Sequence, residues 1–162
     1  MESINVIKSS KHPLPQYETE GSVGMDLRAW VSSPRTKTIS DCFIQSRDGN
    51  ELKLYIRPMG RAVIDTGLKM QLPSDVEGVI RNRSGMTARD GLVAQIGTID
   101  SDYRGSIMVT IINFGDKMCE ISDGDRIAQI VFHEVKRFSL NVVDALDETA
   151  RGAGGHGHTG VR

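Results

Sequence analysis

The chain has 162 residues, of which 38% are hydrophobic, 25% are charged and 17 are glycine, a composition typical of one soluble globular domain. The 20 basic and 21 acidic residues give a net charge of −1, which disfavours a general nucleic-acid or anionic-membrane surface. Because no stretch approaches ~18 apolar residues, the N-terminus has no signal-peptide pattern and the two cysteines form no CxxC pair, we expect a cytoplasmic protein.

Short apolar runs separated by glycine indicate an all-β chain. Twelve of the 17 glycines lie between Gly21 and Gly124, and they divide the sequence into runs of strand length. We expect strands at residues 5–8, 25–31, 43–45, 52–56, 61–65, 68–71, 77–81, 106–112, 118–121 and 126–135. Strands this short, with turns this frequent, are typical of a sandwich or barrel.

Several stretches carry a more particular expectation. Residues 106–112 are β-branched and apolar on both alternating faces, which predicts a central strand buried on both sides. The segment 32–60 is expected to be irregular, with a hairpin turn at residues 47–50. The helical candidates are residues 84–89, a turn or two at most, and residues 140–146, where apolar side chains recur at i, i+3 spacing.

The composition changes abruptly at Arg151. We therefore expect one domain at residues 1–150, followed by a glycine-rich tail at residues 151–162 that is mobile until something orders it. The tail contains a literal GxGxxG, but a dinucleotide site needs a strand before this pattern and a helix after it. Its HxH pair supplies too few ligands for a zinc site. What remains is a set of glycine N–H groups that can wrap an anion.

The densest polar cluster, residues 97–105, comes immediately before the strand expected at residues 106–112. Asp100 and Asp102 bracket a serine at this strand entrance. They fit an Asx-type turn in which the carboxylates cap backbone N–H groups. They also fit a site with a general base, where Tyr103 presents an apolar ring and one hydroxyl to a ligand. The residues alone leave both interpretations open.

Two further groups contain residue types that bind phosphate. Arg83, Ser84 and Gly85 follow an expected strand; a guanidinium binds phosphate oxygens bidentately, a hydroxyl donates, and glycine allows close backbone approach. The same residues fit a solvated loop in which Ser84 is a helix N-cap. Gln129 stands among apolar residues of another expected strand, so its amide needs a partner, either a neighbouring backbone group or a ligand.

In their order and spacing these groups resemble the five sequence motifs of the homotrimeric dUTPase family. The matching segments are residues 24–29, 83–85, 97–105, 124–129 and 151–160. This resemblance implies a distorted jelly-roll-like β-barrel with one short helix and a flexible glycine-rich C-terminal arm. It also implies hydrolysis of dUTP to dUMP and pyrophosphate, with Mg²⁺ held mainly by the triphosphate. Such an activity limits uracil in DNA and supplies dUMP for dTMP synthesis.

The resemblance gives the third motif the central roles. Asp100 takes the position of the general base, which orients and deprotonates a water for in-line attack on the α-phosphate. Tyr103 would pack under the deoxyribose, so that a 2′-hydroxyl clashes. Main-chain groups of a hairpin from Thr98 and Ile99 to Met108 would read uracil and reject the amino group of cytosine.

The other motifs would hold the phosphates. Ser84 and Gly85, with Arg83 behind them, match the phosphate-contacting second motif, and Gln129 matches the fourth. Two acidic residues are expected to support the site without touching substrate, namely Asp26 and Asp102.

The resemblance also gives the tail a role. Arg151 would bind the γ-phosphate while the glycines, Gly157 among them, fold over the nucleotide and exclude water. His156 takes the position that the family usually fills with a phenylalanine stacked on uracil, and imidazole offers less apolar area. In the family, each active site draws on three subunits, so a homotrimer with shared active sites is implied.

Two other functions fit the same resemblance. A dCTP deaminase-like enzyme of this fold needs a catalytic glutamate after the hairpin, and residues 103–106 offer none. A nucleotide-sensing regulatory protein would use the pocket together with the segment 32–60, which is longer than the compact family pattern, to bind a protein partner. The presence of Asp100 argues against a purely non-catalytic role.

Overall fold

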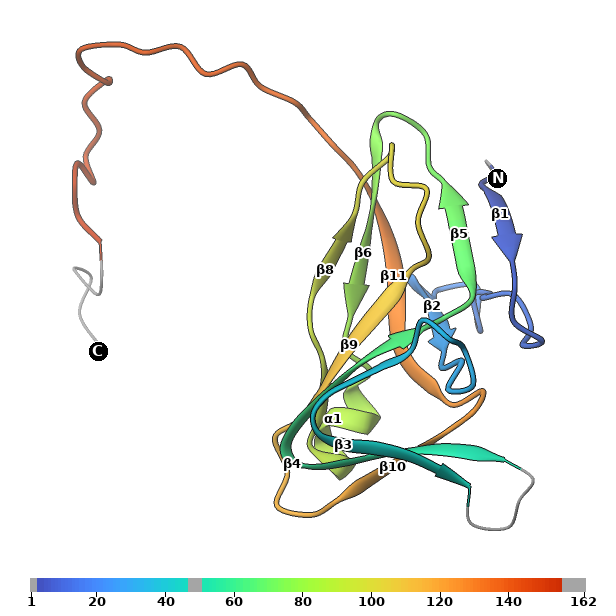
Figure 1. Ribbon diagram of the computed structural model, residues 1–162. Helices are drawn as coiled ribbons and strands as arrows, with labels where there is room; N and C mark the ends of the chain where they lie inside the picture. Colours follow the sequence, from blue (N-terminus) through green and yellow to red (C-terminus); the bar gives the residue numbers. More distant parts are fainter. Residues whose placement is uncertain (1–2, 47–50, 156–162) are drawn as a thin grey trace.

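The computed structural model describes residues 3–46 and 51–155, which fold into eleven short strands and one helix (Figure 1). In chain order the elements are β1 (Asn5–Lys8), β2 (Gly24–Arg28), β3 (Lys37–Ser46), β4 (Leu52–Asp65), β5 (Leu68–Gln71), β6 (Val76–Arg81), α1 (Ser84–Asp90), β7 (Leu92–Ala94), β8 (Gly97–Ile99), β9 (Met108–Asn113), β10 (Cys119–Ser122) and β11 (Arg126–Glu134). The expectation of an all-β chain with one short helix is confirmed.

The strands form three antiparallel sheets. One has β1 and β5; a second has the order β10-β4-β9-β7 with β3 also on β4; the third has the order β2-β11-β6-β8. None of these sheets closes on itself within the described residues, so the arrangement is jelly-roll-like without a continuous barrel wall. Side chains from the larger two sheets meet in one core, including Ile64, Ile111, Ile80 and Ile130, each at most 3% exposed.

The expectation that the segment 32–60 is irregular is wrong, because most of it forms a long β-hairpin of β3 and β4. The strands expected at residues 43–45 and 52–56 lie within these two strands. β3 and β4 pair with two register shifts, between Thr38 and Cys42; beyond them Phe43 lies opposite Tyr55, and the two rings stack at a centroid distance of 5.0 Å. The two strands expected at residues 52–56 and 61–65 are one strand, β4, bent at Met59 (φ 63°). Gly60 follows the bend because a Cβ there would collide with the carbonyl oxygen of Asp41. The turn predicted at residues 47–50 lies outside the described residues.

Two short strands that follow α1 were not predicted from the sequence. β7 and β8 have three residues each, and β8 is held by pairing with β6. β9 lies between β4 and β7, as its apolar run predicts. One face of β9 is buried, with Val109, Ile111 and Asn113. The other face is half-buried, with Met108, Thr110 and Ile112, so only one of the two faces expected to be buried is fully covered within this chain.

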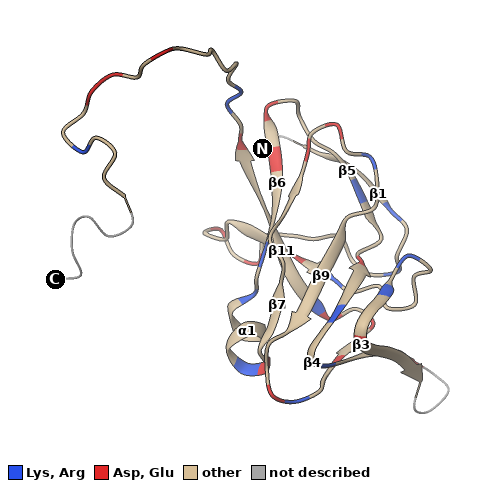
Figure 2. Ribbon diagram, turned by 60° about the vertical axis from the view of Figure 1, so that its left-hand side comes forward, with Lys and Arg blue, Asp and Glu red and all other residues tan. Residues whose placement is uncertain are grey.

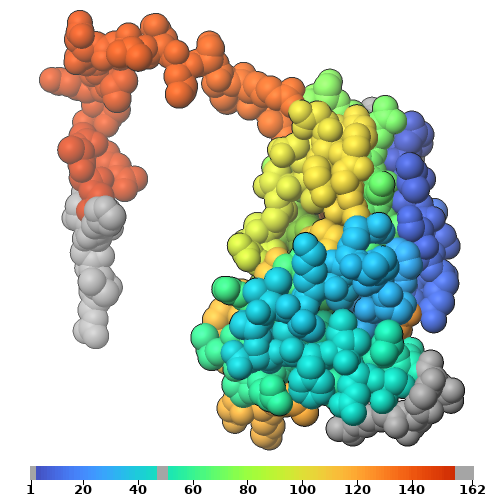
Figure 3. Space-filling view, viewed as in Figure 1, coloured from blue at the N-terminus to red at the C-terminus, as the bar shows by residue number. Residues whose placement is uncertain are grey.

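The two helical candidates have opposite outcomes. α1 forms one residue longer than expected, packs on the core through Met86 and ends at Gly91, whose left-handed conformation (φ 67°) suits glycine. The helix expected at residues 140–146 is wrong, because this stretch is extended and Leu140 and Leu146 are 96% and 87% exposed. Figure 3 shows the segment leaving the body of the molecule, with no surface beside it to bury a helical face.

No helix among the described residues is long and apolar enough to cross a membrane.

Candidate functional site

Most of the predicted site residues fall into two groups within the chain, and those of the C-terminal tail belong to neither. The first, which we call the arginine cluster, surrounds a cavity of about 340 Å³ at the end of β6 and the start of α1. It is lined by Asp26, Arg83, Ser84, Gly85, Met86, Arg89, Arg126 and Gln129. The second, the hairpin cluster, is the connection from β8 to β9, residues 98–108.

Asp26 organises the arginine cluster. Its carboxylate lies on β2 and accepts a hydrogen bond from Arg83 Nε at 2.8 Å, while Arg126 Nη1 lies 3.2 Å from its other oxygen. Arg83 also donates from Nη1 to the backbone carbonyl of Arg126 at 3.2 Å. One carboxylate therefore holds two guanidinium groups side by side, and Arg126 Nη1 also lies 3.7 Å from Glu18 Oε1. Both arginines line the cavity, and guanidinium groups suit an anion.

Arg126 was missed as a site residue, although it stands inside the fourth motif. The feature of the sequence that could have identified it is its position, because Arg126 is the first residue of the strand that carries Gln129. Because β11 pairs with β2, Arg126 comes within reach of Asp26, and that pairing could not be read from the sequence of β11 alone.

The amide of Gln129 has a backbone partner. Its Nε2 donates to the carbonyl of Asn82 at 2.8 Å, because Gln129 is paired with Arg81 across β11 and β6. On its other side the amide lies against Gly24, where a Cβ would collide with Gln129 Oε1. In a single chain the partner of the Gln129 amide is therefore a backbone group rather than a ligand. Gln129 fixes the loop that leads into α1, and it also borders the cavity.

The second motif opens α1. The helix N-cap is Arg83, and no side chain caps the helix, so the interpretation of Ser84 as the N-cap is wrong. Ser84 and Gly85 are the first two helical residues and both are exposed. A Cβ built on Gly85 meets no atom within 4 Å, which leaves space above this backbone. The hydroxyl of Ser84 and the backbone of Gly85 therefore lie at an accessible edge of the cavity.

The hairpin cluster is a tight turn closed by main-chain and tyrosine contacts. The backbone N–H of Tyr103 donates to the carbonyl of Asp100 at 3.1 Å, and the Tyr103 hydroxyl donates to the carbonyl of Ser106 at 3.0 Å. The Tyr103 ring lies so close over Gly105 that a Cβ there would collide with it. Arg104 adds hydrogen bonds from Nη1 to the carbonyls of Ser101 and Tyr103.

The two carboxylates of this turn are both exposed. Neither Asp100 nor Asp102 caps a backbone N–H group with its side chain in the described part of the chain, so the Asx-turn interpretation is not supported. The turn keeps its shape without them, which leaves both carboxylates available to solvent or ligand. Thr98 is exposed on β8, whereas the side chain of Ile99 is 7% exposed and packs in the core.

The two clusters do not meet in one chain. Ile80 pairs with Gly97 and Gly78 with Ile99, so β8 carries Asp100 to one end of β6 while Arg83 follows the other end. Arg83 lies five positions after Gly78, and β6 ends at Arg81, so an extended chain places the two about 16 Å apart. Figure 1 shows α1 and the β8–β9 connection at opposite ends of the body.

The C-terminal arm lies away from both clusters. After β11 the chain runs outward, and Figures 1 and 2 show residues 140–155 well clear of the body from two directions. Arg151 donates from Nε to the carbonyl of Gly154 at 2.9 Å, within a turn of the arm itself. Two predicted site residues, His156 and Gly157, lie outside the described residues.

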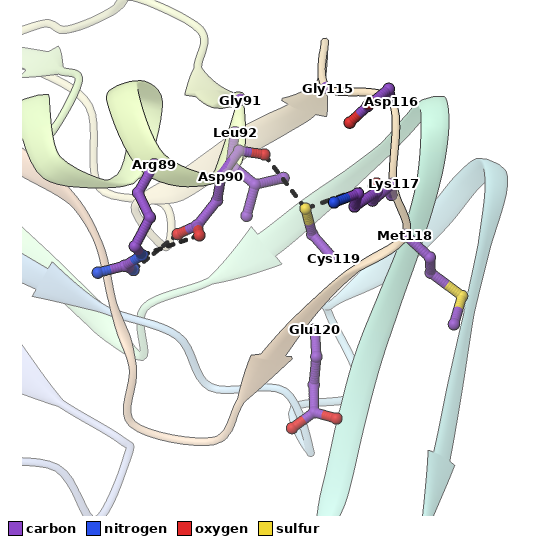
Figure 4. A pocket seen from close by; sticks show the side chains of 10 residues that line it. All are labelled: Arg89, Asp90, Gly91, Leu92, Gly115, Asp116, Lys117, Met118, Cys119 and Glu120. Carbon is purple, nitrogen blue, oxygen red and sulfur yellow. Dashed lines mark hydrogen bonds and ion pairs between the residues drawn. The ribbon is translucent and has the colours of Figure 1, made fainter.

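A separate and larger cavity, of about 500 Å³, lies between α1 and the β9–β10 connection (Figure 4). Arg89 and Asp90 pair there at 2.7 Å, and the thiol of Cys119 donates to the carbonyl of Asp90 at 3.3 Å. Burial, with a smaller contribution from Asp90, raises the pKa of this thiol and so disfavours its thiolate form. None of the predicted site residues lines this cavity, so its size does not mark the functional site.

The fold and the arginine cluster together define an all-β protein with a cavity suited to an anionic ligand. Residues 51–160, more than half of the chain, match the family model described as dUTPase. The chain is 38% identical over 159 residues to the deoxyuridine 5'-triphosphate nucleotidohydrolase of Finegoldia magna, covering 97% of this chain and 98% of that protein. It is 41% identical over 151 residues to the enzyme of the same name from Anaplasma marginale, covering 92% and 90%.

Solved structures agree on the fold. The dUTPase of Staphylococcus bacteriophage 80alpha with dUPNHPP superposes with a TM-score of 0.79 at 22% identity, covering 99% of this chain and all of that one. The dUTPase of phage phi11 of S. aureus superposes with a TM-score of 0.72 at 19% identity, covering 91% and 100%. The chain belongs to the dUTPase family.

Proposed function

We propose that this protein hydrolyses dUTP to dUMP and pyrophosphate. The observation that carries the proposal is the arginine cluster, in which Asp26 holds Arg83 and Arg126 beside the exposed Ser84 and Gly85. Such a set of guanidinium, hydroxyl and backbone groups matches the charge and size of a polyphosphate. The names of the relatives support the uracil nucleotide as the substrate. The reaction would limit uracil in DNA and supply dUMP for dTMP synthesis in the cytoplasm.

In this proposal the hairpin cluster supplies the chemistry. The exposed carboxylate of Asp100 orients a water and takes its proton as the water attacks the α-phosphorus in line. Asp102, two residues along the same turn, is also exposed and is proposed not to touch the substrate. The half-exposed ring of Tyr103 packs under the deoxyribose, and main-chain groups of residues 98–99 and 108 read the uracil edge.

The complete site is proposed to form in a homotrimer. A nucleotide contacting both clusters has to reach groups at opposite ends of β6, which one chain does not bring together. The arm supports assembly, because Phe138, Leu140 and Val142 are 81%, 96% and 97% exposed at the i, i+2 spacing of a strand that buries one face. Arg151 and the tail residues His156 and Gly157 would then reach the nucleotide of another subunit.

Mg²⁺ is proposed to enter with the nucleotide. Within the described residues no group of three or more His, Cys, Asp or Glu side chains is placed to hold a metal ion, and Asp26 is already paired with two arginines. The donor set therefore fits an ion held mainly by phosphate oxygens rather than by a protein cage. When bound, the ion neutralises charge on the triphosphate. A structural Mg(II) ion is named for the phage phi11 dUTPase.

The test is pyrophosphate release from dUTP by the wild type and by Asp100→Asn. We expect the wild type to release pyrophosphate and the variant to lose at least about 100-fold in kcat, since general-base catalysis contributes that much or more. Asp102→Asn is the matched control, because it removes an exposed carboxylate from the same turn, and we expect it to keep most of the activity. Equal rates for the wild type and Asp100→Asn would refute the base assignment, and no activity in the wild type would refute the function.

A further inference from the structure

A buried carboxylate lies at the end of β4, outside every motif of the resemblance. Asp65 is fully buried, and its two oxygens together accept four hydrogen bonds. Oδ2 accepts from Ser33 Oγ at 2.6 Å and Arg35 Nε at 2.9 Å, and Oδ1 accepts from Ser106 Oγ at 2.5 Å and the backbone N–H of Gly67 at 2.9 Å. Asp65 therefore joins β4, the loop after β2 and the end of the hairpin cluster.

The carboxylate stays ionised in this position. Burial acts to raise the pKa of Asp65, but the hydrogen bonds from Ser106, Ser33 and Gly67 and the charge of Arg35 outweigh it and hold the pKa below its usual value. An ionised carboxylate only accepts hydrogen bonds, so all four donors keep a fixed direction toward it. Near neutral pH the carboxylate therefore accepts all four hydrogen bonds.

Ser106 links this carboxylate to Tyr103. Its hydroxyl donates to Asp65, and its backbone carbonyl accepts the hydroxyl of Tyr103 at 3.0 Å. The Tyr103 side chain is otherwise at the surface, with the residue 41% exposed, and it lies directly over Gly105. The orientation of the ring is thus set by where Ser106 is held.

The neighbouring residue is held by backbone contacts instead. Ile107 donates its N–H to the carbonyl of Leu68 at 2.8 Å, and its own carbonyl accepts the N–H and the hydroxyl of Thr66 at 3.2 and 2.9 Å. These contacts anchor the start of β9 and do not involve the Asp65 side chain. Removing the hydroxyl of Ser106 should therefore loosen the acceptor of Tyr103 without detaching β9 from the core.

We propose that Asp65, acting through Ser106, is a positioning residue that fixes the Tyr103 ring and thereby sets the selectivity for deoxyribose over ribose. The inference rests on the proposed function, in which that ring packs under the sugar. A 2′-hydroxyl is excluded only if the ring cannot retreat, because exclusion of this kind depends on a surface that does not yield. The hydrogen bond from Ser106 to the buried carboxylate supplies that resistance.

The experiment compares Ser106→Ala with Ser33→Ala. Both serines are buried, at 7% and 5% exposure, and each gives one short hydroxyl hydrogen bond to Asp65, but only Ser106 belongs to the hairpin cluster. Steady-state kcat and KM are measured for dUTP and for UTP, together with thermal unfolding. We expect both variants to unfold at a similar, lower temperature than the wild type. We expect only Ser106→Ala to lower the ratio of kcat/KM for dUTP to that for UTP, by about fivefold.

The ratio of kcat/KM for dUTP to that for UTP distinguishes a positioning role of Ser106 from a general loss of stability. A Ser106→Ala ratio equal to the wild-type ratio would overturn the inference, and so would an equal fall of the ratio in both variants. In either case the proposed function would stand, because the wild type would still release pyrophosphate from dUTP. An inactive wild type would refute the proposed function itself, and the inference would fall with it.

Discussion

Gly24 offers a sharp test of how the arginine cluster is built. A Cβ at this position would collide with Gln129 Oε1, and it would lie 3.1 Å from Gln129 Cδ and 3.2 Å from Val131 Cγ2. Gly24→Ala should therefore displace the Gln129 amide and break its hydrogen bond to the carbonyl of Asn82. The lost bond costs about 1 kcal/mol, and overpacking costs about 1–3 kcal/mol more. We expect a total loss of roughly 2–4 kcal/mol in the free energy of unfolding.

Gly24→Ala should lower the free energy of unfolding much less in a chain that lacks the Gln129 amide. In Gln129→Ala, two of the three close atoms are gone and only the Val131 contact at 3.2 Å remains, so Gly24→Ala should cost less than about 1 kcal/mol. A double-mutant cycle measured by urea unfolding, at one protomer concentration, gives the coupling free energy, which we expect at about 1–4 kcal/mol. Gly85→Ala is the matched control, because its Cβ meets no atom within 4 Å. Equal costs of Gly24→Ala in both backgrounds would refute the steric reasoning.

Three further outcomes are expected. Phe138→Ser combined with Leu140→Ser in the arm should shift the proposed trimer toward monomers in sedimentation analysis and lower activity at high dilution, because these side chains are 81% and 96% exposed in one chain. The depressed pKa of Asp65 contributes stability that is present above the unfolded-state pKa of about 3.9 and is lost as the pH falls through the folded-state pKa. The difference in melting temperature between the wild type and Asp65→Asn should therefore shrink as the pH is lowered from 7 toward 3. His156→Phe should lower the KM for dUTP, because phenylalanine presents more apolar area to uracil; an unchanged or raised KM would contradict the assigned stacking position.

The strands could be predicted where side-chain pattern alone decides the structure. β1 and β5 match their expected bounds, and the apolar run of β9 indicates a central position that the pairing with β4 and β7 confirms. β8 could not be found in this way. It is three residues long and includes a glycine and an exposed threonine, and it is a strand because β6 lies beside it.

The error at residues 140–146 has a different cause. The i, i+3 spacing of Leu140, Val143 and Leu146 fits a helix only if a surface is present to bury that face. Phe138, Leu140 and Val142 also follow the i, i+2 spacing of a strand, and the arm is extended with all three side chains exposed. Periodicity could not decide between the two, because neither face of the arm is buried against the described residues.

In the candidate site, too, residue type could be read from the sequence, whereas contacts between residues far apart along the chain could not. Arg83, Ser84 and Gly85 could be identified from residue type, but the role of Asp26 depends on β11, which brings Arg126 to one of its oxygens while Arg83 reaches the other. The sequence likewise left the partner of Gln129 open, since its backbone acceptor at Asn82 is 47 residues away along the chain.

The positions of the two clusters connect assembly to substrate binding. Arg83 and Asp100 follow opposite ends of the paired strands β6 and β8, so the separation is built into the register of this sheet and a side-chain rotation cannot remove it. In the proposed trimer, a nucleotide that contacts both clusters therefore joins two copies of the chain. A ligand that binds only the assembled form stabilises it by mass action. The nucleotide is then both the substrate of the site and one of the groups that hold the site together, which explains why a single chain can expose both clusters and the apolar arm.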